Sequence, residues 1–171
     1  MNTGKRVLVV SAVCVSSVVI FCFLALMAIG LLLETGYIPD TKVLKGSELT
    51  SKTRQTLVDL EVLKLGEEVL YFYSAGLMSV AEDGNFFTPE RVVSYENREG
   101  EFSVSQAEYS EIVSITTDSE ASYFEDGLIL VETTGEDDFY LLVSSEDGRD
   151  KLFIQELRKR WRTGQQKQSS E

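Results

Sequence analysis

Histidine is absent from the sequence, and both cysteines, Cys14 and Cys22, lie in one apolar stretch near the N-terminus. Without histidine, and without a cysteine elsewhere, the chain has no Ser-His or Cys-His nucleophile, no usual zinc ligand set and no imidazole proton shuttle. A disulfide outside that stretch is excluded as well. We therefore expect a protein that is not an enzyme and uses no cofactor or metal, with a folded part stabilised by an ordinary apolar core.

Basic residues are also scarce. The sequence has 16 lysines and arginines against 28 aspartates and glutamates, and every acidic residue lies at or after Glu34. Because only Lys5 and Arg6 precede that point, residues 34–171 carry a formal charge of about −14. Nucleic acids and anionic lipid headgroups both favour clustered Lys and Arg. We therefore expect no nucleic-acid binding and no binding of the exposed domain to anionic vesicles.

Residues 7–33 form an apolar run without a single charge. A helix of this length reaches roughly 40 Å, more than the ~30 Å hydrocarbon core of a bilayer. A secretory signal peptide has a shorter apolar region, and cleavage after Ala28-Ile29-Gly30 would leave three leucines at the new N-terminus. The run therefore predicts an uncleaved single-pass transmembrane helix.

The charges that flank the run indicate its orientation. Lys5 and Arg6 precede it, whereas the first charge after it is Glu34. Since basic flanks resist translocation, we predict that residues 1–6 are cytoplasmic and that the domain lies outside the cell membrane. Within the run, Ala12 and Ser16 form a small-xxx-small pair that favours weak homo-oligomerisation through the span.

Residues 34–64 are predicted to form a linker and a juxtamembrane helix. Glycine, proline and mixed charge over 34–46 favour an irregular, mobile linker. Ser47 is a suitable N-cap, and apolar residues recur at helical spacing over 47–63. The alternation of apolar and charged residues at 58–63 leaves open an early strand in place of the helix.

From Gly66 onward, short β-rich runs alternate with acidic and glycine-containing turns. Glu82-Asp83-Gly84-Asn85 and Asn97-Arg98-Glu99-Gly100 have turn composition. This spacing predicts an antiparallel sheet in a sandwich or barrel. The expected strands are residues 69–73, 86–88, 91–95, 102–105, 112–116, 122–124, 128–133 and 139–143.

The last expected element is an amphipathic helix over residues 147–162. Phe153, Leu157 and Trp161 recur at four-residue steps and form one apolar stripe. Because such a stripe must cover something, we expect this helix to cap the open end of the sheet, with Leu157 and Trp161 in the core. Residues 163–171 are polar and are expected to be a disordered tail.

Two motifs within residues 65–162 carry a family resemblance. Gly66-Glu67-Glu68-Val69-Leu70 and the segment 87–95 (FTPERVVSY), followed by strands and the amphipathic helix, resemble the bacterial pleckstrin-homology-like (PH-like) and GRAM-type domains. Those domains typically show G-E-x-[VL]-L and L-T-x-x-R-[LVI]-[LVI]-x-Y. Phe87 stands here where Leu is usual, and Pro89 occupies a turn position that is more often polar.

The resemblance implies a mainly β domain, a bent antiparallel sheet or barrel of about seven strands capped by the C-terminal helix. It also implies a binding or scaffolding module. Thr88, Arg91 and Tyr95 match signature positions, and we interpret them as residues that hold the hairpin together. The loop after the first strand lacks the basic residues of lipid-binding members.

We therefore expect a membrane-anchored, non-catalytic PH-like domain that acts as a protein-interaction or assembly module with an unidentified protein partner. The alternative is an extracytoplasmic lipid- or ligand-sensing domain. An interaction module should expose an apolar groove or a sheet edge, whereas a sensor should enclose a pocket with converging polar groups.

Overall fold

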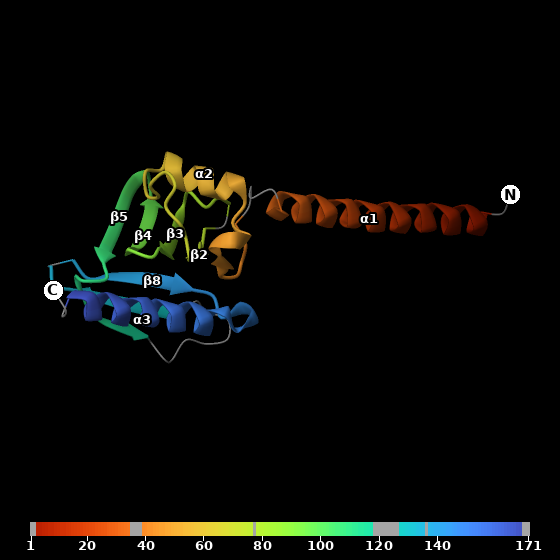
Figure 1. Ribbon diagram of the computed structural model, residues 1–171. Helices are drawn as coiled ribbons and strands as arrows, with labels where there is room; N and C mark the ends of the chain where they lie inside the picture. Colours follow the sequence, from red (N-terminus) through yellow and green to blue (C-terminus); the bar gives the residue numbers. More distant parts are fainter. Residues whose placement is uncertain (1–2, 35–38, 77, 118–126, 136, 169–171) are drawn as a thin grey trace.

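The structure is a computed structural model that describes residues 3–34, 39–76, 78–117, 127–135 and 137–168. Its first element is the helix α1, Thr3–Glu34. The window Cys14–Leu31 is long and apolar enough to cross a membrane, and none of it is buried inside the protein. Figure 1 shows α1 extending away from the rest of the chain. The chain therefore has one N-terminal apolar helix, as residues 7–33 predicted.

The segment after α1 departs from the predicted irregular linker at residues 44–46, whereas the described residues 39–43 contain neither helix nor strand. Val43 is fully buried, and the two-residue strand β1, Leu44–Lys45, pairs with strand β2, Tyr71–Tyr73. A 3₁₀ turn, η1, follows at Gly46–Glu48. Gly46 lies so close to Val69 that an added Cβ would meet the Val69 carbonyl oxygen at 1.6 Å. This close approach, invisible in the composition, ties the segment to the sheet.

The predicted helix over 47–63 is shorter than expected. Helix α2 spans Ser51–Asp59, and its N-cap is Thr50, whose side chain accepts a hydrogen bond from the Thr53 amide. Ser47 lies instead within η1. Glu61 then adopts a left-handed backbone conformation, which turns the following apolar residues toward the sheet. The early strand is wrong, since the described residues 58–63 contain no strand.

Sheet A has five antiparallel strands in sequence order. After β1 and β2 come β3, Asp83–Phe87, β4, Arg91–Arg98, and β5, Glu101–Glu108. The β4–β5 hairpin closes through Glu99 and Gly100, both with positive φ, as a two-residue hairpin turn requires. The predicted turn at 82–85 is wrong in part, because Asp83, Gly84 and Asn85 already pair with β4.

Sheet B has three antiparallel strands, also in sequence order. They are β6, Ile112–Thr117, β7, Gly127–Thr133, and β8, Phe139–Val143. The predicted strand 122–124 lies outside the described residues. A 3₁₀ turn, η2, Glu146–Gly148, then leads into helix α3, Arg149–Gln168.

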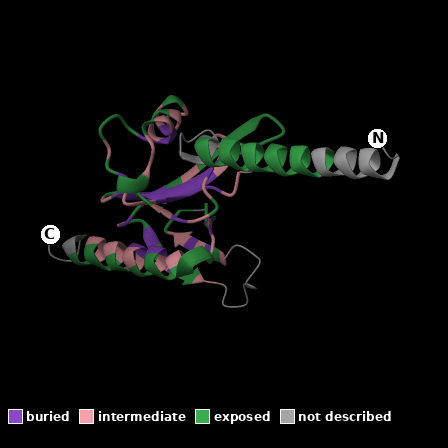
Figure 2. Cartoon of the chain, turned by 90° about the vertical axis from the view of Figure 1, so that its right-hand side faces the viewer, coloured by how far each residue is buried: buried purple, intermediate pink, exposed green. Residues whose placement is uncertain are grey.

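The elements are arranged around sheet A, and α3 contacts both sheets. Figure 1 shows α2 on one side of sheet A, with sheet B and α3 on the other. Buried residues gather accordingly in two clusters, one between α2 and sheet A and one between the two sheets and α3. Figure 2 shows this burial in the middle of the domain, whereas the described part of α1 is exposed.

Helix α3 runs past the predicted end at 162, so the disordered tail is wrong for residues 163–168. Gly164 allows a close approach to the Tyr109 side chain, which an added Cβ would meet at 2.6 Å. The Gln165 side chain donates hydrogen bonds to the carbonyls of Tyr109 and Ile112. These contacts fix a polar segment whose composition alone indicated disorder.

The predicted fold class is confirmed. The domain is mainly β, with two bent antiparallel sheets, a C-terminal helix packed on them and an N-terminal apolar helix. Strands β2 to β8 make seven, beside the short β1. The described strands form two separate sheets and do not close into a barrel, and the opening between the sheets creates the site described next.

Candidate functional site

The three signature residues Thr88, Arg91 and Tyr95 are buried and bonded within the domain. The Thr88 hydroxyl, in the β3–β4 turn, accepts hydrogen bonds from the amides of Glu90 and Arg91. The Arg91 guanidinium lies against the Glu67 carboxylate and donates to the Val62 carbonyl. Their contacts are those of structural residues.

Tyr95 has a similar role across sheet A. Its ring packs over Gly84, the residue paired with it on β3, where an added Cβ would meet the hydroxyl at 2.5 Å. The hydroxyl donates to the Val80 carbonyl at 2.6 Å. Burial, and after it the charge of Asp83, raises the pKa of Tyr95, so the phenol stays a hydrogen-bond donor. It thereby holds the loop between β2 and β3 against the sheet.

The apolar stripe of α3 packs on the core between the sheets. Phe153 and Leu157 are fully buried, and the Phe153 ring meets the Phe87 ring edge-on at 4.9 Å between centroids. Trp161 is only half-buried, and its indole N–H donates to the Ile112 carbonyl at 2.9 Å. The helix therefore bonds the edge of β6 as well as packing on it.

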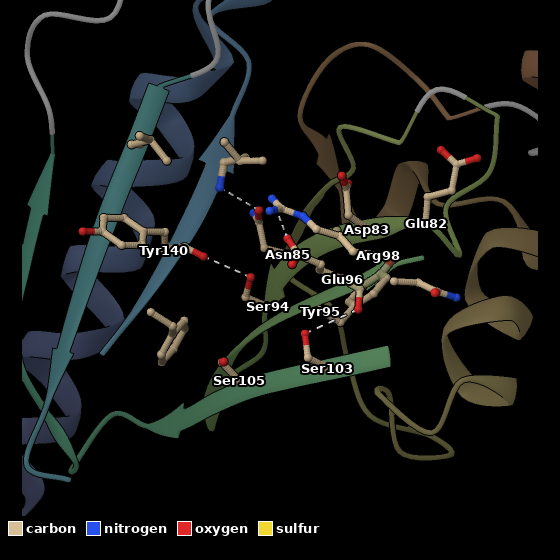
Figure 3. A pocket seen from close by; sticks show the side chains of 15 residues that line it. Glu82, Asp83, Asn85, Ser94, Tyr95, Glu96, Arg98, Ser103, Ser105 and Tyr140 are labelled. Carbon is tan, nitrogen blue, oxygen red and sulfur yellow. Dashed lines mark hydrogen bonds and ion pairs between the residues drawn. The ribbon is translucent and has the colours of Figure 1, made fainter. Parts of the chain in front are cut away.

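A cleft of about 670 Å³ opens where β8 crosses sheet A. Its floor is polar and comes from β3, β4 and β5, while sheet B contributes an apolar wall. Figure 3 shows the serines of β4 and β5 along this floor. The lining residues on which the site depends are Asn85, Ser94, Ser103 and Ser105 on the floor, Leu128, Tyr140 and Leu142 on the wall, and Glu82, Asp83, Glu96 and Arg98 among the charged ones.

Two floor residues bond the free edge of β8 at the base of the cleft. The Asn85 side-chain oxygen accepts from the Leu142 amide at 2.8 Å, and the Ser94 hydroxyl donates to the Tyr140 carbonyl at 3.0 Å. Figure 3 draws both bonds. In a closed barrel, the backbone of a neighbouring strand would bond this edge of β8. Here the side chains of Asn85 and Ser94 supply the bonds, so the two sheets are joined and the cleft beside them stays open.

The side chain of Asn85 also has a buried nitrogen that lacks a hydrogen-bond partner among the described residues. Asn85 is 3% exposed, and its Nδ2 finds no hydrogen-bond partner among the residues that the structure describes. Near it, burial raises the pKa of Asp83, and the charges of Glu82 and Glu96 add to this effect. Hydrogen bonds from the backbone amides of Ala75 and Gly76 act in the opposite direction but do not outweigh it. The cleft therefore offers an amide donor and an acidic end.

Strand β5 forms the open side of this cleft. It is the edge of sheet A, and among the described residues no strand pairs with its far side. The hairpin register pairs Arg98 with Glu101, so hydrogen-bonded pairs fall on odd residues of β5. The N–H and C=O groups of Phe102, Val104 and Gln106 consequently point to the free side.

Most side chains of β5 are exposed to solvent. Phe102 is 40% exposed and Val104 44% exposed, on the face that α2 covers further along. On the other face, Ser103 and Ser105 border the cleft. A row of unpaired backbone groups with open side-chain positions on both faces is a template for strand addition.

The sequence singles out Tyr95 among the residues that line the cleft, but as a residue that holds the hairpin together. It places Asn85 in a turn, and it gives Ser94, Ser103 and Ser105 no role beyond their positions in the expected strands. The one available signal was the run Phe102-Ser103-Val104-Ser105, whose apolar and polar residues alternate as in a strand with one exposed face.

Comparison with known proteins adds little to this geometry. No family model matches the chain, and no curated protein matches it. It is similar to the crystal structure of a DUF1696 family protein with a pleckstrin-homology domain from Shewanella loihica PV-4. The TM-score is 0.47 and the identity 16%, over 72% of this chain and 96% of that one. A similarity at this level assigns neither family nor function.

Proposed function

We propose that this chain is a single-pass membrane protein whose PH-like, GRAM-type domain binds a protein partner and catalyses no reaction. The observation that carries the proposal is the open edge of β5. The outward backbone N–H and C=O groups of Phe102, Val104 and Gln106 meet no strand among the described residues, and a cleft follows one face. Exposed sheet edges are ordinarily blunted or covered in soluble domains. An eight-residue edge left open is best explained by a partner segment.

Membrane anchoring is supported by α1, whose apolar window is exposed along its whole length. Such a surface is stable in lipid and costly in water. Lys5 and Arg6 on its N-terminal flank favour a cytoplasmic N-terminus and an extracytoplasmic domain. Self-association through Ala12 and Ser16 remains part of this proposal.

A protein partner is favoured over an anionic membrane surface by the cations of α3. Arg158 donates to the Ile115 carbonyl of β6, and Lys159 and Arg160 both pair with Glu156. These three cations are therefore engaged within the domain, and residues 34–171 as a whole are strongly acidic. Both facts weaken attraction to anionic headgroups.

Position-specific photocrosslinking in native membranes tests the proposal. A photoreactive amino acid replaces Val104 on β5 in the full chain, and a matched variant carries it at Leu152 on α3, which is also half exposed. We expect a discrete crosslinked species from position 104 only. Equal crosslinking from both positions, or none from 104, would contradict an interaction site at β5.

A small polar ligand in the cleft is the second candidate, favoured by the buried Asn85 Nδ2 without a partner among the described residues. A carbonyl or carboxylate oxygen would complete its hydrogen bonding. Ligand retained on the purified full-length chain, detected by native mass spectrometry and lost in Asn85→Leu, would favour this function.

A further inference from the structure

Taking the proposed function as its basis, we propose that the partner supplies an extended, cationic segment. This segment adds to β5 as a further strand of sheet A, and a lysine or arginine side chain crosses the serine floor to reach Glu96. The proposal names the backbone conformation and the charge of the bound segment. Three features of the site, its backbone, its charge and its dimensions, carry it.

The backbone of β5 determines the conformation of the segment. The outward N–H and C=O groups of Phe102, Val104 and Gln106 follow one another at every second residue over the middle of the strand. Only a chain in extended conformation meets donors and acceptors at that repeat. A helix or a compact loop would satisfy one of them at most.

The charges around the cleft determine the sign of the segment. Glu82, Asp83 and Glu96 line the cleft against one cation, Arg98, which pairs with Glu96 at 3.0 Å. Glu101 and Glu108 add two carboxylates at the ends of β5. A cationic segment would find complementary charge at this edge, and an anionic one would be repelled.

The dimensions of the floor determine which side chain fits. Ser103 lies opposite Glu96 in the β4–β5 register. A strand added beside β5 would lie two strand spacings, about 10 Å, from β4. A lysine or arginine side chain spans roughly two thirds of that distance, and the glutamate side chain covers the rest. Serine at 103 and 105 leaves that path clear, whereas larger residues would block it.

Charge also argues against a second copy of this chain as the occupant. Pairing of two β5 strands would bring together two domains of about −14 each and place the glutamates of both edges close to one another. A partner of opposite charge avoids this repulsion.

The test uses the full chain in uncharged detergent micelles and cyclic hairpin peptides as preorganised strands. The first hairpin has a background of valine and threonine, with lysine at three positions on one face. Two matched hairpins carry glutamine or glutamate at the same three positions. A fourth is the lysine hairpin with N-methylated amides on its free edge. Binding is measured by fluorescence anisotropy at two salt concentrations, and amide hydrogen exchange identifies the protected residues.

We expect the lysine hairpin to bind about tenfold more tightly than the glutamine one at low salt, with loss of this advantage as salt is raised. Exchange should slow at Phe102, Val104 and Gln106, and N-methylation should abolish binding. Glu96→Gln should weaken binding about threefold, the effect of one exposed charge pair. Glu146→Gln, an equal charge change in the turn η2 before α3, should leave binding unaltered.

Several results would overturn the inference. Equal binding of the lysine and glutamine hairpins would remove the cationic requirement, and protection away from β5 would remove the strand addition. Dimerisation of the chain through β5 would identify a second copy as the occupant. A crosslinked partner at position 104 would uphold the proposed function in each of these cases, so the two failures are distinguishable.

Discussion

Arg91 and Glu67 form a two-pronged ion pair in the interior of the domain. Arg91 Nε lies 2.8 Å from Glu67 Oε1, and Nη2 lies 2.6 Å from Oε2. The two side chains are 10% and 9% exposed. Each belongs to one of the two motifs that carry the PH-like resemblance, so the motifs meet as one contact. It joins the segment before β2 to the start of β4.

Arg91→Ala should destabilise the domain strongly, because it leaves the Glu67 carboxylate buried without its partner. We expect a loss of about 3–5 kcal/mol in the free energy of unfolding. Urea titration followed by the fluorescence of the single tryptophan, Trp161, measures it. The matched control is Arg98→Ala, whose pair with Glu96 is exposed and should be worth less than about 1 kcal/mol. Equal losses would contradict the buried pair's importance.

The same pair should make stability depend on acid pH. Burial acts to raise the pKa of Glu67, but the Arg91 hydrogen bonds and the Lys64 amide outweigh it, so the pKa lies below 4.5. The Glu67 carboxyl therefore loses its proton at a lower pH in the folded state than in the unfolded state. Its contribution to the free energy of unfolding is complete above pH 4.5. It declines as the pH falls through the lowered pKa. Unfolding titrations from pH 6 to pH 3 should show that decline, and Glu67→Gln should flatten it.

Substitutions of Phe153 and Trp161 should lower the free energy of unfolding by different amounts, since only Phe153 is fully buried. Phe153→Ala removes its edge-on contact with Phe87 and leaves a cavity, which should cost about 3–5 kcal/mol. Trp161→Phe keeps most of the ring but loses the bond to the Ile112 carbonyl, at about 1 kcal/mol. Thermal unfolding by circular dichroism measures both. A cost for Trp161→Phe as large as that for Phe153→Ala would show that the indole bond, rather than burial, governs the α3 contact.

Asn85 should hold the free edge of β8 against sheet A. Asn85→Ala leaves the Leu142 amide without its acceptor, and we expect a loss of about 1–3 kcal/mol. Amide exchange at Leu142 should accelerate more than exchange at Leu141, which β7 bonds. Ser105→Ala, a cleft change that touches neither bond, is the control. Unchanged exchange at Leu142 would mean that the side-chain bond does not secure β8.

The proposed topology gives a prediction about protease access. Proteinase K added to spheroplasts should digest residues beyond Glu34 if the domain faces outward, as Lys5 and Arg6 indicate. Immunoblotting of a C-terminal tag follows the loss, and a known cytoplasmic protein serves as the integrity control. Protection of the tag until lysis would reverse the orientation.

The sequence predicts those parts of the fold that repeat. The uncharged run of α1, the four-residue steps of Phe153 and Leu157, and the alternating strands each leave a periodic signal. The ends of elements do not, because they depend on contacts between distant residues. Gly164 allows α3 to approach Tyr109 and continue, and Asn85 belongs to β3 because β4 pairs with it.

The cleft was beyond sequence reasoning for a related reason. Strand order decides that β5 is an edge, and the crossing of β8 over sheet A decides that Ser103 and Ser105 stay open. Neither is written in the local composition of β5. Asn85 has the residue type of a turn and the role of a strand partner, so its type pointed away from its position.

Val43 is the first residue of the core between the sheets, and only eight residues, 35–42, separate it from the end of α1. An eight-residue linker in fully extended conformation spans about 26–29 Å at most, less than the diameter of the domain. If α1 sits in the bilayer as proposed, the domain cannot leave the membrane surface. A partner must then come to that surface. For a partner that is itself held in the membrane, the encounter is confined to two dimensions, and the raised effective concentration sustains even a weak strand addition.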